Sequence, residues 1–228
     1  MRKSTFMFII ATIALTLISC QKEPVRVACV GDSITYGHGI ADRGHDTYPA
    51  ILDSLLGDGY DVRNFGISGR NLINRGDYPY MKEQIFQDAL DFMPDIVTIT
   101  LGTNDSKPQN WIFSQDFKDD MKLMIDSFKA LESAPEIWLC LPTPAMGHAC
   151  NINDSIISNG VIPYIKEVAE ELGLDIIDLN TPLQARRDYF PDTIHPNEAG
   201  QEEIAGIIFN AIRNSRKKIN FHKNGHNS

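Results

Sequence analysis

The sequence predicts an α/β fold, a three-layer α/β/α sandwich built around a five-stranded parallel sheet. Five short apolar segments alternate along the chain with segments whose apolar residues recur at helical spacing. This alternation is typical of βαβ units, in which helices cover both faces of a parallel sheet. The length of 228 residues and the hydrophobic content of 43% fit one domain with a full core.

The expected strands are short and apolar. The first, Val25–Val30, stops at Gly31, and the third, Asp95–Gly102, is rich in the β-branched residues that favour strands. The other expected strands are Tyr60–Gly66, Glu136–Pro144 and Leu174–Leu179.

The expected helices lie between these strands and place their apolar residues on one side. Gly57 and Gly173 each end a helix, Pro94 stops another, and the longest segment is strongly amphipathic. In chain order the expected helices are Tyr48–Gly57, Met81–Met93, Ser114–Ser133, Ile162–Gly173 and Asn197–Asn214.

Residues 1–20 have the features of a lipoprotein signal peptide. A short positive region precedes the apolar stretch Phe6–Ile18, which is too short for a comfortable membrane span. The stretch ends in LISC, which resembles a bacterial lipobox whose Cys20 becomes the lipid-bearing N-terminus. The alternative is an ordinary secretory signal with a chance cysteine. We expect a lipid-anchored protein of the bacterial cell envelope, on the periplasmic or outer-surface side, with one domain over 21–215 and a mobile basic tail over 216–228.

Polar residues that could perform nucleophilic catalysis follow the expected strands. Ser33 follows the first strand, and Asn104 follows the third. Ligands bind beyond the carboxyl ends of the strands in such sheets. A serine needs a base to become a nucleophile, and Asp192, three residues before His195, can orient that imidazole. Glycine N–H groups and an asparagine amide can supply donors for an oxyanion.

Four blocks in this order resemble those of the SGNH hydrolases, also called the GDSL esterase family. They are GDS at 31–33, GISG at 66–69, GTND at 102–105 and DTIH at 192–195. The resemblance implies a flavodoxin-like fold, with Ser33 as nucleophile, His195 as general base and Asp192 as its orienting residue. It also implies an oxyanion hole made of the Ser33 N–H, the Gly66 N–H and the Asn104 side chain. Ser33 is not in a G-x-S-x-G elbow, which favours this family over the α/β-hydrolases.

The resemblance implies a serine esterase that works through an acyl-enzyme. Polar stretches and the absence of a long apolar lid segment favour a carbohydrate O-acetylesterase acting on sialic acid or polysaccharide. A lysophospholipase or thioesterase-type acylhydrolase is the alternative reaction, and a non-catalytic glycan-binding lipoprotein is the alternative class. The expected partners are a small-molecule or glycan ester and the membrane that holds the lipid anchor; the oligomeric state stays open.

Other classes of protein do not fit the sequence. The net charge of -9 disfavours nucleic acid as a partner. The glycines after Ser33 do not form a nucleotide-binding phosphate loop. No group of histidines, cysteines and acids has metal-ligand spacing, so we expect neither a metal nor a cofactor. Cys29 and Cys140 read as buried hydrophobes, although Cys140 could pair with Cys150 in an oxidising compartment.

Several further residues near the blocks have an ordinary structural interpretation beside a functional one. Asp32 and Asp105 are expected to bond nearby backbone. The residues that could line a pocket, or could equally be solvated or packed, are His38, His45, Arg70, Asn71, Trp111 and Phe113.

Overall fold

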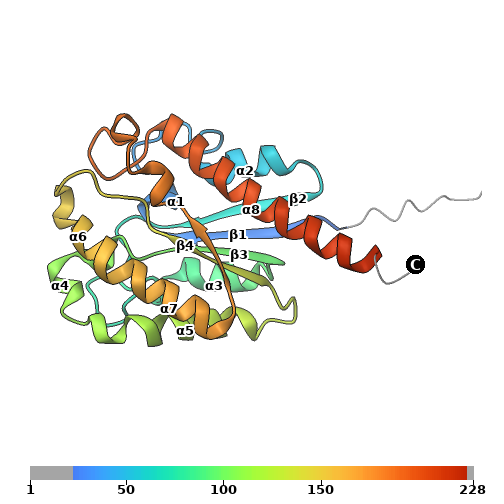
Figure 1. Cartoon of the computed structure of the whole chain (residues 1–228), viewed down its shortest axis with the longest axis horizontal. Helices are drawn as coiled ribbons and strands as arrows, with labels where there is room; N and C mark the ends of the chain where they lie inside the picture. The colour runs from blue at the N-terminus through green and yellow to red at the C-terminus, as the bar shows by residue number, and fades with distance from the viewer. Residues whose placement is uncertain (1–22, 225–228) are drawn as a thin grey trace, which may run out of the picture.

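The computed structural model describes the backbone of residues 23–224 and the side chains of residues 23–215. The signal peptide and Cys20 lie outside the described residues. One parallel five-stranded sheet, in the order β2-β1-β3-β4-β5, forms the middle layer (Figure 1). Its strands are β1 Val25–Gly31, β2 Tyr60–Gly66, β3 Ile96–Thr100, β4 Glu136–Leu141 and β5 Asp175–Asp178. The predicted α/β class and strand number are confirmed.

Helices cover both faces of the sheet (Figure 1). Helices α2 and α8 lie above it in this view, and α3, α5 and α7 lie below. The longer helices are α2 Tyr48–Leu56, α3 Gln84–Asp91, α5 Phe117–Lys129, α7 Ile162–Leu172 and α8 Glu198–Asn224. The short helices and helical turns are α1 Ser33–Tyr36, η1 Tyr80–Lys82, η2 Asn104–Ser106, α4 Pro108–Trp111, η3 Ser114–Asp116, η4 Ala149–Asn151, α6 Asp154–Ile156, η5 Ile157–Val161, η6 Thr181–Leu183 and η7 Arg187–Tyr189.

The core consists of two apolar layers, one on each face of the sheet. Successive side chains of a strand point to opposite faces. Val27 and Cys29 of β1 therefore pack on the α2 and α8 side, whereas Ala28 and Val30 pack on the side of α5 and α7. Both sets are fully buried, which explains why β1 is apolar at consecutive positions.

Some element ends differ from the sequence prediction. Strand β4 stops at Leu141 because the following Pro142 has no N–H to extend the ladder. The helix expected over 81–93 is broken at Glu83, whose backbone is extended. Helix α8 continues to Asn224, so the expected helix end at Asn214 is wrong. Extending a packed helix adds one hydrogen bond per residue without a new nucleus; mobility of this segment stays a prediction. Among the helices of residues 23–224, none combines the length and hydrophobicity that a bilayer span requires.

The topology creates a crevice between β1 and β3. Gly31 at the end of β1 pairs with Gly66 of β2 on one side and with Thr100 of β3 on the other. Strand β2 lies beside β1 on one side, and β3 lies beside β1 on the other side. The loops that follow β1 and β3 therefore lead away from each other. Such a switch point in strand order is where open α/β sheets bind ligands.

Candidate active site

Ser33 is the first residue of α1 and stands just beyond the end of β1. The Asp32 carboxylate caps this helix, because its Oδ1 accepts a hydrogen bond of 3.0 Å from the Ile34 N–H. The Ser33 N–H occupies the first position of the helix, where an amide has no intrahelical acceptor. Asp32 is fully buried, and this burial raises its pKa to about 6. The cap therefore holds Ser33 in place and leaves its N–H available.

Ser33, His195 and Asp192 form a continuous chain of hydrogen bonds. The Ser33 Oγ lies 2.9 Å from Nε2 of His195, and the Nδ1 of His195 lies 2.6 Å from Oδ2 of Asp192. The other Asp192 oxygen accepts the backbone N–H groups of Ile194 and His195 at 2.9 and 2.7 Å. The three predicted residues are thus brought together, although 159 positions separate Ser33 from Asp192.

The electrostatics of this chain suit a base that is neutral at rest. Partial burial lowers the pKa of His195, Asp192 opposes that effect, and nearby His38 adds to it. Burial alone would raise the pKa of Asp192, but hydrogen bonds from the His195 backbone and ring hold it below its ordinary value. With Nδ1–H held by Asp192, the Nε2 lone pair faces the serine hydroxyl.

Gly66 is not placed to stabilise an oxyanion. Its N–H donates to Oδ1 of Asn64 at 2.9 Å, and Gly66 is absent from the wall of the cavity that contains Ser33. The assignment of Gly66 to the oxyanion hole is therefore wrong. Gly69, at the other end of the same block, lines that cavity with a φ of 81°. Within residues 23–224 its N–H has no hydrogen-bond acceptor. The block GISG contains both glycines, and its residue pattern does not show which of the two N–H groups is free.

Asn104 lies at the start of η2 and forms part of the same wall. Its side-chain nitrogen donates to the Arg70 carbonyl at 3.0 Å and to Oδ2 of Asp32 at 3.3 Å. The neighbouring Asp105 accepts the backbone N–H groups of Leu72 and Ile73 at 2.8 to 3.0 Å. Burial raises the pKa of Asp105 to about 7. Asp32 and Asp105 thus support the loops around the site, as predicted.

The cavity over Ser33 has a volume of about 190 Å³. Beside Ser33, His195 and Asn104, its wall includes the apolar side chains of Ile152 and Ile194, both almost fully buried. The remaining members of the wall are His38, Ser68, Gly69, Thr103, Lys107 and Cys150. The space is smaller than the roughly 300 Å³ from which sites for drug-sized ligands begin.

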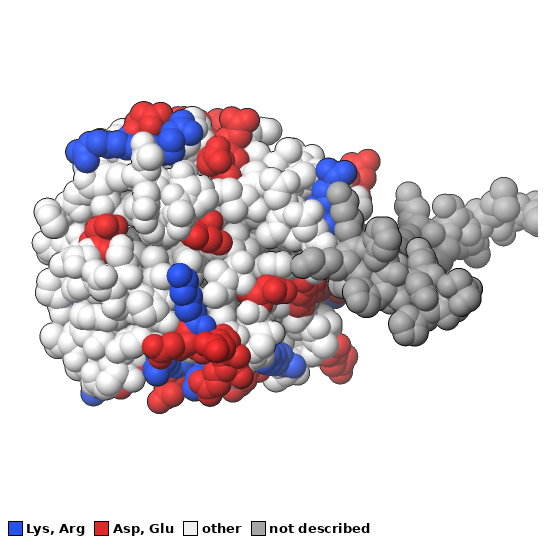
Figure 2. Space-filling model, in the orientation of Figure 1, with Lys and Arg blue, Asp and Glu red and all other residues white. Residues whose placement is uncertain are grey.

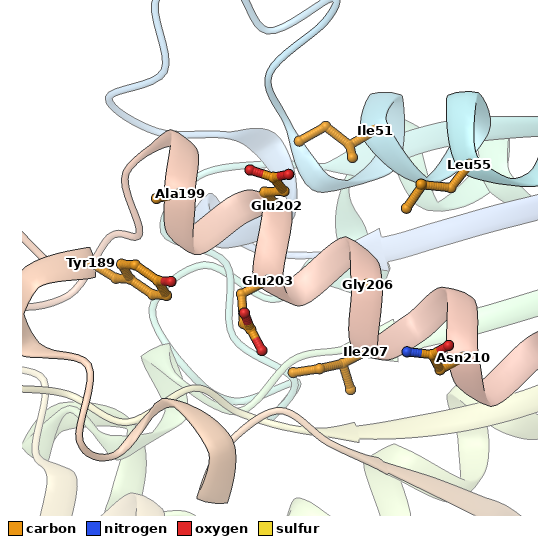
Figure 3. A pocket seen from close by; sticks show the side chains of 9 residues that line it. All are labelled: Ile51, Leu55, Tyr189, Ala199, Glu202, Glu203, Gly206, Ile207 and Asn210. Atoms are coloured by element: carbon orange, nitrogen blue, oxygen red, sulfur yellow. The ribbon is translucent and has the colours of Figure 1, made fainter.

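A larger hollow of about 390 Å³ lies between α2 and α8 (Figure 3). Ile51 and Leu55 of α2 line it together with Glu202, Glu203 and Ile207 of α8, and Glu202 points toward Ile51. Its wall contains none of the residues predicted for catalysis. Size alone therefore does not identify the catalytic pocket, and the hydrogen-bonded serine does.

Most of the other candidate residues have structural contacts away from the cavity. Arg70 pairs with Glu83 at 2.9 Å, and buried Asn71 accepts the Tyr78 N–H. Trp111 stacks on Tyr164 at 5.8 Å between ring centroids. Phe113 lies under the guanidinium of Arg75, and His45 pairs with Asp42 at the surface.

His38 and Cys150 lie at the cavity, whereas Cys29 and Cys140 lie in the core. His38 reaches the cavity wall, where its ring centroid lies 4.2 Å from that of His195. Cys29 and Cys140 are buried and free, whereas Cys150 is exposed at the cavity. The alternative of a bond between Cys140 and Cys150 is therefore wrong.

A potential group of metal ligands also lies at this site. Ligand atoms of His38, Asp192 and His195 all lie within 4.8 Å of one another. Sequence spacing missed the group because His38 is far from the other two residues along the chain.

The fold and the site together define a serine hydrolase. Residues 29–203 match the family model described as the GDSL-like Lipase/Acylhydrolase family. The chain therefore belongs to the GDSL-like lipase/acylhydrolase family.

Relatives extend this finding. The chain is 44% identical over 211 residues to an acetylxylan esterase of Xylanibacter ruminicola, covering 85% of this chain and 44% of that protein. It thus spans less than half the length of this relative. A lipase/acylhydrolase from Enterococcus faecalis has a similar structure, with a TM-score of 0.68 and 23% identity over 84% of this chain and 96% of that one. Est24, a carbohydrate acetylesterase from Sinorhizobium meliloti, gives a TM-score of 0.66 at 18% identity, over 83% and 98% of the two chains. These two structures confirm the fold.

Proposed function

We propose that the chain is a carbohydrate O-acetylesterase that releases acetate from a polysaccharide of the xylan type. The observation that carries the proposal is the 44% identity to an acetylxylan esterase over 85% of this chain. This identity favours an acetylated polysaccharide over sialic acid as the substrate. On the face shown in Figure 2, basic side chains are interspersed with acidic ones, which suits a neutral glycan better than a polyanion.

The reaction proceeds through an acetylated serine. Ser33 Oγ attacks the carbonyl carbon of the ester while its proton moves to Nε2 of His195, and Asp192 stabilises the imidazolium. The tetrahedral intermediate collapses when His195 gives that proton to the leaving sugar hydroxyl. A water molecule then attacks the acyl carbon, His195 takes its proton, and acetate leaves as Ser33 recovers its own.

Three donors stabilise the negative oxygen of each intermediate in this proposal. They are the Ser33 N–H, the Gly69 N–H and the side-chain amide of Asn104. The hydrogen bond from Asn104 to Asp32 is long, at 3.3 Å, so its proton can be shared with a substrate oxygen at little cost. The bond to the Arg70 carbonyl, at 3.0 Å, meanwhile keeps the amide in position.

The cavity supports a short acyl group. Its volume is about 190 Å³, and the buried side chains of Ile152 and Ile194 limit it on the apolar side. A longer acyl chain directed toward Ile152 and Ile194 would displace packed side chains, and such overpacking typically costs about 1–3 kcal/mol.

Hydrolysis of a p-nitrophenyl ester series from acetate to octanoate tests the acyl preference. We expect kcat/KM to fall steeply beyond acetate and to be lost in Ser33→Ala with an unchanged melting temperature. Preference for octanoate would instead support a lysophospholipase or thioesterase. Turnover by Ser33→Ala at the parent rate would contradict the assignment of the nucleophile.

The sugar is tested with natural acetyl donors. We expect acetate release from acetylated xylan to exceed release from O-acetylated sialic acid at equal concentrations of ester. The reverse order would assign the enzyme to sialic acid and contradict the polysaccharide proposal.

We also propose that Cys20 carries lipid and holds the enzyme at the cell envelope. The described chain enters β1 at the end of the domain opposite the carboxyl ends of the strands (Figure 1). An anchor there would direct Ser33 away from the membrane. Cys20→Ala should abolish incorporation of labelled palmitate and release the enzyme from the membrane fraction; membrane retention without Cys20 would contradict the anchor.

A further inference from the structure

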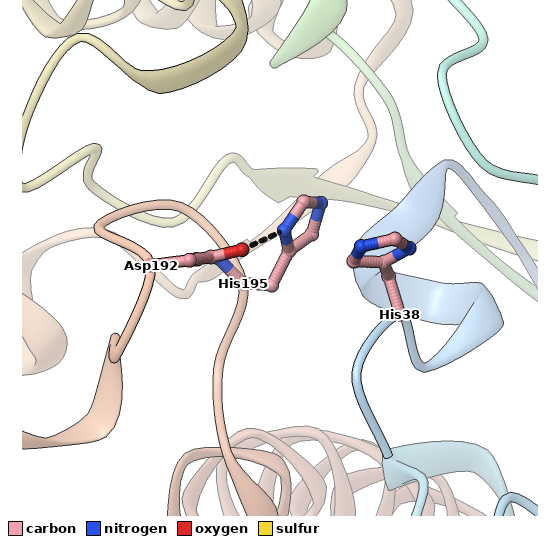
Figure 4. A group of neighbouring side chains, drawn as sticks. All are labelled: His38, Asp192 and His195. Carbon is pink, nitrogen blue, oxygen red and sulfur yellow. Dashed lines mark hydrogen bonds and ion pairs between the residues drawn. The ribbon is translucent and has the colours of Figure 1, made fainter. Parts of the chain in front are cut away.

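We propose that the resting active site binds a transition-metal ion such as Zn²⁺ through the imidazoles of His195 and His38, and that this ion inhibits the esterase. The starting observation is the arrangement in Figure 4. The two imidazoles lie side by side, and the Asp192 carboxylate is on the far side of His195. The ring centroids are 4.2 Å apart, and the planes are inclined by 43°.

His195 already has the environment of a metal-binding histidine. Its Nδ1 is hydrogen-bonded to Oδ2 of Asp192 at 2.6 Å, which leaves the lone pair on Nε2. A carboxylate on one ring nitrogen and a metal on the other is the usual arrangement at zinc sites, because the carboxylate fixes the tautomer and raises the basicity of the ligand. The negative charge of Asp192 also favours a nearby cation.

His38 supplies the second imidazole. Its side chain is exposed, and within residues 23–224 neither of its ring nitrogens has a hydrogen-bond partner. It stands between Gly37 and Gly39, in the loop that follows α1. A ring nitrogen of His38 lies within 4.8 Å of a ring nitrogen of His195. In this proposal the exposed His38 ring turns so that its nitrogen and Nε2 of His195 both reach the 2.0–2.1 Å typical of Zn–N bonds. Water from the open side of the cavity completes the coordination.

Inhibition follows from the atom that the metal occupies. The Nε2 lone pair of His195 is the one that must accept the Ser33 proton, and in the free enzyme it lies 2.9 Å from Oγ. A bound ion takes this lone pair, so the base is lost without any change in covalent structure. Imidazole favours Zn²⁺, Cu²⁺ and Ni²⁺, whereas Mg²⁺ and Ca²⁺ prefer oxygen ligands. The proposal rests on His195 as the base of the esterase.

The test compares inhibition in His38→Asn and in a control, His45→Asn, whose histidine is exposed and outside the cluster. Hydrolysis of p-nitrophenyl acetate is measured against ZnCl₂ in a non-chelating buffer, and each variant is normalised to its own zinc-free rate. We expect reversible inhibition that EDTA removes and that MgCl₂ does not produce. The zinc concentration for half inhibition should rise about tenfold or more in His38→Asn, as for loss of a metal-site contact, and stay unchanged in His45→Asn.

A binding measurement separates this proposal from the esterase mechanism. Calorimetric titration of the Ser33→Ala protein with ZnCl₂ needs no turnover and should show a site that disappears when His38→Asn is added. If His38→Asn binds zinc and is inhibited as strongly as the parent, the site is wrong. Absence of inhibition at millimolar zinc in the parent would also overturn the proposal.

Discussion

Replacing Asp192 with asparagine tests how the active site controls its base. Asp192 accepts a hydrogen bond of 2.6 Å from Nδ1–H of His195, and this fixes the tautomer whose Nε2 faces Ser33. An asparagine amide can keep the backbone hydrogen bonds through its oxygen, but its NH₂ group then faces Nδ1. The ring must present a lone pair there and carry its proton on Nε2. Such an imidazole cannot accept the proton of Ser33.

The wrong tautomer should lower kcat by about 10⁴-fold, the effect seen when the aspartate of a serine protease triad is so replaced. This corresponds to about 5 kcal/mol of lost transition-state stabilisation. Asp192→Ala is the matched control, because it removes the charge without imposing a tautomer. We expect Asp192→Ala to be the faster of the two variants, although it loses the backbone hydrogen bonds and about 1 kcal/mol of stability.

The assay is kcat/KM for p-nitrophenyl acetate together with the melting temperature of each variant. If a folded Asp192→Asn enzyme retained about a tenth of the parent kcat/KM or more, Asp192 would not control the tautomer. If Asp192→Ala were the slower variant at equal stability, charge rather than tautomer would be the dominant effect.

Four further predictions follow from the geometry. Burial lowers the pKa of His195, and catalysis requires the neutral ring, so kcat/KM should stay constant from neutral pH to somewhat below pH 6.5 and decrease at lower pH. Since His38 also lowers this pKa, His38→Asn should shift the decrease to higher pH in a pH–rate profile. Gly69→Ala strains a φ of 81° without a steric clash; it should lower kcat by up to about 10²-fold and cost about 1–2 kcal/mol of stability, measured by thermal unfolding. Gln201→Leu leaves the Tyr48 N–H and the Ile34 carbonyl unpaired in the core and should cost about 2–4 kcal/mol in urea unfolding. The pKa of Asp105 rises to about 7 in the folded chain, so its favourable contribution is present below the ordinary value of 3.8 and is lost as pH rises to 7; Asp105→Asn should flatten that decline in unfolding free energy.

The fold could be predicted from the sequence because helices cover both faces of the sheet. Strands buried on both faces are continuous apolar runs, so β1 and β3 stand out without any alignment. The ends of the helices and strands were harder to predict. A local pattern does not reveal that Glu83 adopts an extended backbone or that α8 continues to Asn224, since packing and helix propagation decide both.

Site residues could be predicted from the sequence where the chemistry requires a particular side chain. They could not be predicted where only the direction of a backbone N–H matters. Serine, histidine and aspartate are recognisable by their reactivity, and the structure brings Ser33, Asp192 and His195 together. Gly66 and Gly69 have no side chain to distinguish them, and the deciding fact is a hydrogen bond from the Gly66 N–H to Asn64. No residue pattern shows which of two amides is already paired.

The carboxyl ends of β1, β2 and β3 are aligned across the sheet. This alignment explains why each catalytic residue follows its strand by a fixed number of residues. Gly31 pairs with both Gly66 and Thr100, so β1, β2 and β3 end on one line across the sheet. Ser33, Gly69 and Asn104 follow that line by two, three and four residues respectively. One inserted residue in any of these loops could displace a donor by about 3.3 Å, which exceeds the tolerance of a hydrogen bond to an oxyanion. An insertion at the amino ends of the same strands would leave the donors in place. Loop length beyond the sheet, rather than strand sequence, therefore sets the geometry of the oxyanion hole.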